Sequence, residues 1–308
     1  MRAERRGGSR GRRYAAALCL LGALAARGGA GALEAQQAGI LLRFRPRVGS
    51  RVNTVSEYRI TSVLVGLPSL PDSTLVETDL WTSSLARVLD QQGPQYIMRL
   101  TFDSVRARTR VRSRARVDVP LPGIQRLSLQ LRADEQWHRE RLEATLGTAL
   151  DTAFAGLLTA PFAGFEMALP DSALRVDTPR TVRARFPVGA LLSAGWGFAS
   201  TGSAPGTATL RLDSLVPRSA DTLVYVTMRG TLGPAEVLVV GTGSEAGTGS
   251  ASLVGSLAGT LIWSTGWSAF VAGATGVRLE GRFHLERPGG AVDFTMAMTA
   301  QGTHQVRL

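Results

Sequence analysis

The chain has no lysine and very little cysteine or histidine, and each shortage excludes a class of site. All 35 basic residues are arginine, and the chain has one cysteine and three histidines. Cys19 lies in an N-terminal apolar run that we expect to be removed, which leaves nothing for a disulfide, a thiolate nucleophile or a cysteine-bound metal. His138, His284 and His304 lack metal-ligand spacing, and neither an H-E-x-x-H nor a G-x-S-x-G motif is present. We therefore expect no cofactor, no metal site and no enzymatic activity.

Residues 1–32 are typical of a secretory signal peptide. An arginine-rich start precedes the apolar run Tyr14–Ala26, and Ala30-Gly31-Ala32 supplies the small residues that a signal peptidase reads. The run is shorter than the roughly 20 apolar residues of a membrane-spanning helix. We expect export to the periplasm or the extracellular space, and no transmembrane helix in the mature chain. Without the leader, the net charge falls from +11 to about +5, which does not indicate a nucleic-acid partner.

Most of the remaining sequence alternates between apolar and polar residues, as β-strands do. We expect strands over residues 52–65, 75–89, 95–117, 207–215 and 222–232. Near the C-terminus, the alternation of residues 277–286 resumes at residue 292 after a Pro-Gly turn, which predicts a hairpin. This turn places Phe283 opposite Phe294 and Leu285 opposite Val292 on the buried face. His284 then faces Asp293 on the polar face.

One segment, residues 134–158, breaks the alternation. Its large apolar residues recur every three to five positions, which predicts one amphipathic helix: Trp137, Leu142, Leu146, Leu150, Phe154 and Leu157. The similarity of Leu100–Val105 to Leu210–Leu215 indicates two related halves. The predicted fold is therefore mainly β, with two antiparallel curved-sheet halves (half-barrel or sandwich-like) over residues 33–165 and 166–308, and the helix in the first.

The segment Gly241–Ala246 formally matches the dinucleotide-binding pattern G-x-G-x-x-A. Such a site needs a helix directly afterwards, because the phosphates bind at a helix N-terminus. Another strand-like segment follows instead, so we interpret these residues as a hairpin connection.

Arginine occupies every second position from residue 106 to residue 116. On a strand, these six side chains share one face: Arg106, Arg108, Arg110, Arg112, Arg114 and Arg116. They form either an anion-binding stripe for phosphate-bearing lipid or acidic glycan, or a solvated sheet face whose charges are balanced by neighbouring acids. The aromatic residues that stack on single-stranded nucleic acid are missing between them.

A second candidate site is apolar. Large aromatic residues stand in Gly-, Ala- and Ser-rich segments of the second half: Trp196, Phe198, Trp263, Trp267 and Phe270. Small residues beside large aromatic ones either line a ligand cavity or pack as ordinary core.

Several segments resemble a class of exported β-meander proteins of Gram-negative bacteria. They are the RVGS turn at Arg47–Ser50, LPDSALRV at Leu169–Val176, GTATLRLDSL at Gly206–Leu215, Gly255–Gly281, and the methionine-rich Phe294–Gly302. Such proteins are similar in turn to the half-barrel folds of periplasmic lipoprotein and lipid carriers. The resemblance implies a concave sheet, covered by a helix, with an apolar ligand, and it carries over no functional residues.

The sequence thus predicts an exported, non-enzymatic binding or carrier domain for a lipid-like or other apolar ligand. One alternative is a structural or interaction protein of the cell envelope that uses the arginine face. A second alternative is an outer-membrane β-barrel, which the scarcity of phenylalanine and tyrosine for interfacial girdles disfavours.

Overall fold

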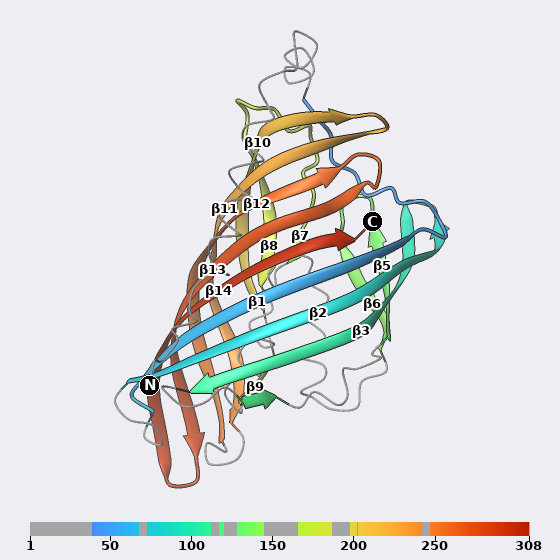
Figure 1. The fold of residues 1–308 in the computed structure, drawn as a ribbon. Coiled ribbons are helices and arrows are strands. Elements are labelled where there is room, and N and C mark those ends of the chain that lie inside the picture. The colour runs from blue at the N-terminus through green and yellow to red at the C-terminus, as the bar shows by residue number, and fades with distance from the viewer. Residues whose placement is uncertain are drawn as a thin grey trace, which may run out of the picture.

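The computed structural model describes residues 39–67, 73–111, 117–119, 128–144, 166–186, 198–201, 203–241 and 247–307. These residues form β1 (Arg51–Val65), β2 (Ser73–Gln92), β3 (Gln95–Val111), β4 (Val117–Val119), β5 (Ser128–Asp134), β6 (Arg139–Ala144), β7 (Glu166–Met167), β8 (Arg180–Phe186), β9 (Phe198–Thr201), β10 (Ala204–Arg218), β11 (Asp221–Gly241), β12 (Gly247–Ser264), β13 (Ala269–Arg287) and β14 (Gly290–Arg307) (Figure 1). The predicted signal peptide, with Cys19, lies outside the described residues.

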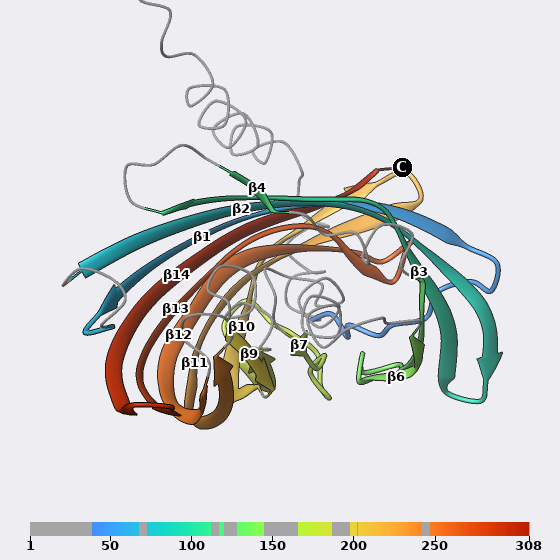
Figure 2. The same ribbon diagram turned by 90° about the horizontal axis from the view of Figure 1, so that it is seen from below.

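All these strands belong to one antiparallel sheet that curls into a half-barrel (Figure 2). The strand order is β6-β5-β3-β2-β1-β14-β13-β12-β11-β10-β8-β7, with β4 beside β3 and β9 beside β11. The first strand therefore pairs with the last, from Asn53–Arg307 to Val65–Thr295. The prediction of a mainly β, curved antiparallel fold is confirmed, but the structure shows one continuous sheet and not the two curved-sheet halves that we expected.

Local alternation determines which face of each strand is buried. In β14, Val292, Phe294 and Met296 are buried, whereas Asp293 and Thr295 between them are exposed. Strands that alternate in this way place one face in the core and the other in water. The concave face of the sheet therefore carries the apolar core.

The predicted C-terminal hairpin is confirmed in register. Phe283 pairs with Phe294 and Leu285 pairs with Val292 across β13 and β14. The two phenylalanine rings stack with their centroids 4.6 Å apart. On the outer face, His284 Nδ1 lies 2.8 Å from Asp293 Oδ1, as the register requires.

The segment between Gly241 and Gly247 joins two antiparallel strands. β11 and β12 pair up to Gly241 and Gly247, and the chain continues as strand through β12. A hairpin connection was therefore the correct interpretation, although residues 242–246 themselves lie outside the described residues.

The predicted helix over residues 134–158 is wrong for the part that the structure describes. Residue 134 ends β5, residues 135–138 form a turn, and β6 follows and pairs with β5. Residues 139–144 form a strand and not a helix because β5 has an open edge whose backbone N–H and C=O groups need partners. The backbone of β6 supplies these hydrogen bonds. The apolar periodicity counted as one series a turn residue, Trp137, a residue of β6 and residues beyond it. Residues 145–158 lie outside the described residues.

The two edges of the curled sheet are connected by the segment of residues 39–45, which we call the crossing segment. At one end, Ile40 exchanges two backbone hydrogen bonds of 2.8 Å with Leu174. At the other end, the Phe44 amide donates to the Glu135 carbonyl, and Arg45 binds the Glu135 carboxylate with two bonds of 2.8 and 2.9 Å. The crossing segment thus spans the opening between the β5–β6 turn and the β7–β8 region (Figure 2).

Candidate ligand-binding cavity

A cavity of about 160 Å³ lies inside the curl, where the ends of β1, β2, β12 and β14 meet the β5–β6 turn. The crossing segment covers it through Phe44, which is 3% exposed. Its lining comes from both sides of the β1–β14 pair, so neither half of the sequence builds it alone. Most of the lining is apolar, as in typical small-molecule sites.

One wall of the cavity consists of aromatic residues from the β12–β13 turn. Trp263 and Phe270 are buried and pack edge to face, with ring centroids 4.9 Å apart. Trp267 is 37% exposed and lines the same cavity, so it lies where the cavity meets solvent. This wall offers a ligand flat apolar surfaces in the geometry that aromatic rings prefer.

The β12–β13 turn is held in place by one carboxylate, Asp221, from the neighbouring β10–β11 turn. Asp221 accepts hydrogen bonds from Ser264 Oγ at 2.6 Å, from Thr265 Oγ1 at 3.0 Å and from the Gly266 amide at 2.7 Å. Burial alone would raise the pKa of Asp221, but these bonds and one from the Thr222 amide outweigh burial and lower the pKa. Asp221 therefore fixes the position of Trp267 from outside the cavity.

The opposite wall contains Phe44, Trp137 and Arg139. The Trp137 ring packs edge to face on Phe44 with centroids 4.1 Å apart. Trp137 has a φ of +67°, in the left-handed region where bulky residues are rare. The turn is supported by the Asp134 carboxylate, which accepts bonds from the amides of Gln136 and His138, both at 2.9 Å.

Arg139 brings a positive charge into this apolar region. Its side chain is 8% exposed, its guanidinium lies 5.6 Å from the Trp137 ring centroid, and Nη2 lies 3.8 Å from the Glu166 carboxylate. Burial lowers the pKa of Arg139, and Glu166 partly opposes the change. Arginine nevertheless keeps its proton in proteins. The cavity therefore has one cationic wall.

His304, at the end of β14, also lines the cavity and carries no charge at neutral pH. It is 7% exposed, and burial lowers its pKa from 6.5 to about 4, opposed by a backbone hydrogen bond with Phe270. Hydroxyl groups from β1 and β2 complete this side of the lining: Ser56, Thr82 and Ser84. These neutral polar groups offer hydrogen bonds without adding charge.

The structure brings together three of the five aromatic residues that the sequence singled out. Trp263, Trp267 and Phe270 line the cavity. Phe198 begins β9 and pairs with Gly241, at the end of β11 far from the strand residues that pair with Trp263. Trp196 lies outside the described residues.

Sequence reasoning missed the wall made by Phe44, Trp137 and Arg139. Trp137 was assigned to a helix, and the short alternation around Phe44, from Leu42 to Arg45, was not taken into account. The available signal was the tryptophan itself, since a large aromatic residue within a polar segment needs an apolar contact somewhere in the fold.

The arginine stripe on β3 lies on the outer face, away from the cavity. Arg106, Arg108 and Arg110 are described, whereas Arg112, Arg114 and Arg116 lie outside the described residues. Arg108 Nε lies 2.7 Å from Asp118, and Arg110 forms an ion pair with Glu77 of β2.

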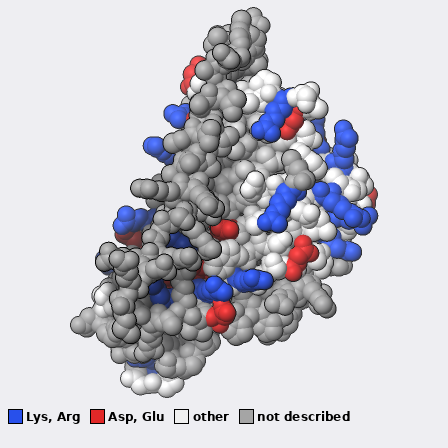
Figure 3. Space-filling view, in the orientation of Figure 1, with Lys and Arg blue, Asp and Glu red and all other residues white. Residues whose placement is uncertain are grey.

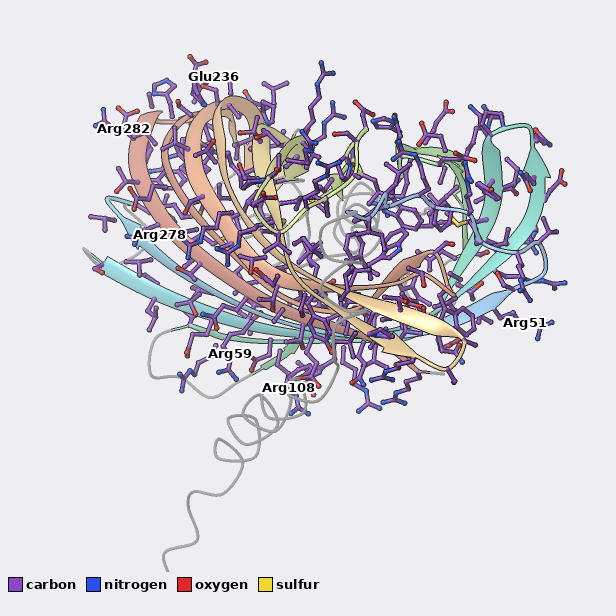
Figure 4. The ribbon with its side chains drawn as sticks, turned by 90° about the horizontal axis from the view of Figure 1, so that it is seen from above. Arg51, Arg59, Arg108, Glu236, Arg278 and Arg282 are labelled. Atoms are coloured by element: carbon purple, nitrogen blue, oxygen red, sulfur yellow. The ribbon has the colours of Figure 1, made fainter. Side chains whose placement is uncertain are left out.

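Two of these arginines thus form ion pairs with neighbouring acids, as expected for a solvated sheet face. Arg59 and Arg108 point away from the concave side (Figure 4), and blue and red atoms are interspersed on the face shown in Figure 3.

The described residues contain no group of three or more His, Cys, Asp or Glu side chains that would hold a metal ion. His138 and His284 are on the surface, where each lies beside one aspartate, Asp134 or Asp293. In the part of the chain that the structure describes, no helix has the length and apolarity needed to cross a bilayer.

Comparison with known proteins gives no family. A scan of protein-family models found no match, and a search of curated proteins found none either. Among solved structures, a multiple mutant of the Rh. blastica porin aligns with 81% of this chain and 99% of its own, with 6% identity and a TM-score of 0.23. A BenF-like porin from Pseudomonas fluorescens Pf-5 aligns with 82% of this chain and 98% of its own, with 8% identity and a TM-score of 0.19. Likenesses at these scores establish neither a shared fold nor a shared function.

Proposed function

We propose that this chain is an exported, non-enzymatic binding or carrier protein for a small apolar or lipid-like ligand. The observation that carries the proposal is the cavity on the concave face, with Trp263, Trp267 and Phe270 on one wall. Convergent aromatic residues around a partly open cavity are the usual basis of small-molecule binding. The arginine-rich leader supports export to the periplasm or the extracellular space.

The size of the cavity limits the ligand. A volume of about 160 Å³ is similar to that of an engineered protein cavity of roughly 150 Å³ that binds benzene. We therefore expect one ring or a short acyl segment to occupy it. The remainder of a longer lipid would extend out of the cavity beside Trp267, which is partly exposed at the rim.

The outer face of the described sheet supports a water-exposed protein over a barrel embedded in lipid. Arg278, Glu280 and Arg282 alternate along the outer face of β13, and all three are exposed. Barrels in outer membranes show the opposite pattern, with an apolar band facing outward. Here the apolar residues face the concave side, where a ligand binds.

The first test is native mass spectrometry of the mature protein purified from its own cell envelope, followed by organic extraction. We expect an apolar compound to co-purify with the protein. Phe270→Ala is expected to reduce its occupancy, because this substitution removes one side of the aromatic wall. Trp81→Ala is the matched control, since Trp81 is an aromatic residue on the outer face of β2, beside Arg108.

The outcome is read from the two variants together. Loss of the compound in Phe270→Ala and its retention in Trp81→Ala support the cavity as the binding site. A protein that carries no compound and binds no apolar dye at this cavity contradicts the proposal.

A further inference from the structure

We propose that the ligand of this cavity is a monocarboxylate, whose acid group is bound by Arg139 and by the indole N–H of Trp137. This inference rests on the proposed function and specifies the ligand class. A molecule that spans the cavity would place its acid at the β5–β6 turn and its apolar part against Trp263 and Phe270.

The first reason is the location of Arg139. A guanidinium with its side chain only 8% exposed lines a cavity that is otherwise mostly apolar. Burial of a charge is unfavourable unless an opposite charge is nearby. Glu166 supplies one such charge at 3.8 Å, but its side chain is 43% exposed to solvent, which weakens the attraction. A carboxylate inside the cavity would face the same cation with less water between them.

The second reason is the indole nitrogen of Trp137. Among the described residues, no hydrogen-bond acceptor lies within reach of Trp137 Nε1, although the atom is buried. Indole can only donate, so its partner must be an acceptor. Trp137 and Arg139 lie on the same wall, with the guanidinium 5.6 Å from the ring centroid. Two donors on one wall match the acceptor oxygens of a carboxylate.

The third reason is the backbone of Trp137. Its φ of +67° suits glycine or asparagine far better than tryptophan. Strained residues of this kind persist at functional sites, where the side chain is needed in one position. The two aspartate-bonded amides beside Trp137 hold the turn in this conformation.

The surrounding charges favour a monoanion over a phosphate dianion. Arg139 is one cation, and Glu166 already places one negative charge beside it. His304 on the same cavity stays neutral at pH 7 because its pKa is about 4. Among the described residues that line the cavity, Arg139 is the one permanent cation, so none of them would balance a second negative charge on the ligand.

The test compares phenylacetate with its neutral analogue 2-phenylethanol, by titration calorimetry at pH 7 on the mature protein after removal of bound compounds. We expect phenylacetate to bind roughly tenfold tighter or more, as charge-assisted hydrogen bonds imply. Arg139→Gln is expected to remove this preference and leave the affinity for the alcohol unchanged. Trp137→Phe keeps a smaller aromatic ring and removes the N–H donor, so it is expected to reduce the preference.

Glu166→Gln gives a result that a purely structural role would not produce. It removes the competing negative charge, and we expect tighter binding of phenylacetate with no change for 2-phenylethanol. Arg108→Gln, on the outer face, is the matched control and should change neither affinity. Glu166→Gln and Trp137→Phe keep the test decisive if Arg139→Gln fails to fold.

The possible results separate this inference from the proposed function. Equal affinity for the acid and the alcohol leaves the binding protein in place and overturns the carboxylate assignment. Weaker acid binding in Glu166→Gln overturns it as well. Binding of neither compound contradicts the proposed function, and the carboxylate assignment falls with it.

Discussion

Protonation of His304 is predicted to destabilise the fold as the pH falls from 7 to 4. His304 is 7% exposed, and burial lowers its pKa from 6.5 to about 4. Between these two values the unfolded chain binds the proton and the folded chain does not. The free energy of unfolding therefore falls as the pH decreases through this window.

The size of the effect follows from the shift in pKa. Each pKa unit corresponds to about 1.4 kcal/mol, so the shift to about 4 amounts to roughly 3 kcal/mol lost between pH 7 and pH 4. This is a large share of the roughly 5–15 kcal/mol that is typical of whole proteins. Urea unfolding at pH 7, 5.5 and 4 measures it.

The variant His304→Gln isolates this contribution. It removes the titrating group and keeps a side chain that can donate a hydrogen bond to Phe270. We expect its unfolding free energy to fall by about 3 kcal/mol less than that of the parent between pH 7 and pH 4. His284→Gln, on the exposed outer face, is the matched control for replacing a histidine. Parallel slopes for the parent and His304→Gln would refute the assignment of the pH dependence to His304.

Substitutions at three further positions test the structural account, each by urea unfolding. Asp221→Asn should cost about 2 kcal/mol at pH 7, because the carboxylate accepts several bonds from the β12–β13 turn; since its pKa is lowered, the difference from the parent should vanish only as the pH falls well below 3.8. A tryptophan emission spectrum unchanged from the parent, whose Trp267 lies beside this turn, would argue against a role of Asp221 in the turn. Phe294→Ala should cost about 3–5 kcal/mol through loss of the stacked, buried ring, and Phe294→Leu much less. A loss in Phe294→Ala as small as that in Phe294→Leu would mean that neighbouring side chains fill the space left by the ring. Arg108→Gln should change the free energy of unfolding by less than about 1 kcal/mol, because both partners of its ion pair are mostly exposed. A larger loss would mean that this ion pair stabilises the fold more than its exposure predicts.

The strands and the C-terminal hairpin were predictable because their signals are local. Period-2 alternation fixes the buried face of each strand, and a Pro-Gly turn fixes which residues face each other. Phe283 opposite Phe294 follows from these two facts alone. The pairing of β1 with β14 had no such signal, since nothing in either strand identifies a partner from the other end of the chain. This pairing joins into one sheet what we expected to be two curved-sheet halves.

The cavity was predictable only in part, for the same reason. Trp263, Trp267 and Phe270 are close in sequence, so a single segment predicts the aromatic wall. Phe44 and Arg139 reach the cavity only because the crossing segment and the β5–β6 turn meet there. The helix prediction failed where apolar spacing competed with the unpaired edge of β5, and hydrogen bonding along the ladder decided the outcome.

The pairing of β1 with β14 has a consequence for the biogenesis of the protein. A chain that emerges N-terminus first, in synthesis or in the export proposed above, delivers β1, β2 and β3 before β14, the second neighbour of β1, is present. Until β14 arrives, the backbone groups along one side of β1 remain open to pairing with other chains, which is a known route to aggregation. Contacts between the two ends of a chain also slow folding. Correct folding therefore depends on how long the edge of β1 stays unpaired before β14 arrives, and on what covers that edge meanwhile.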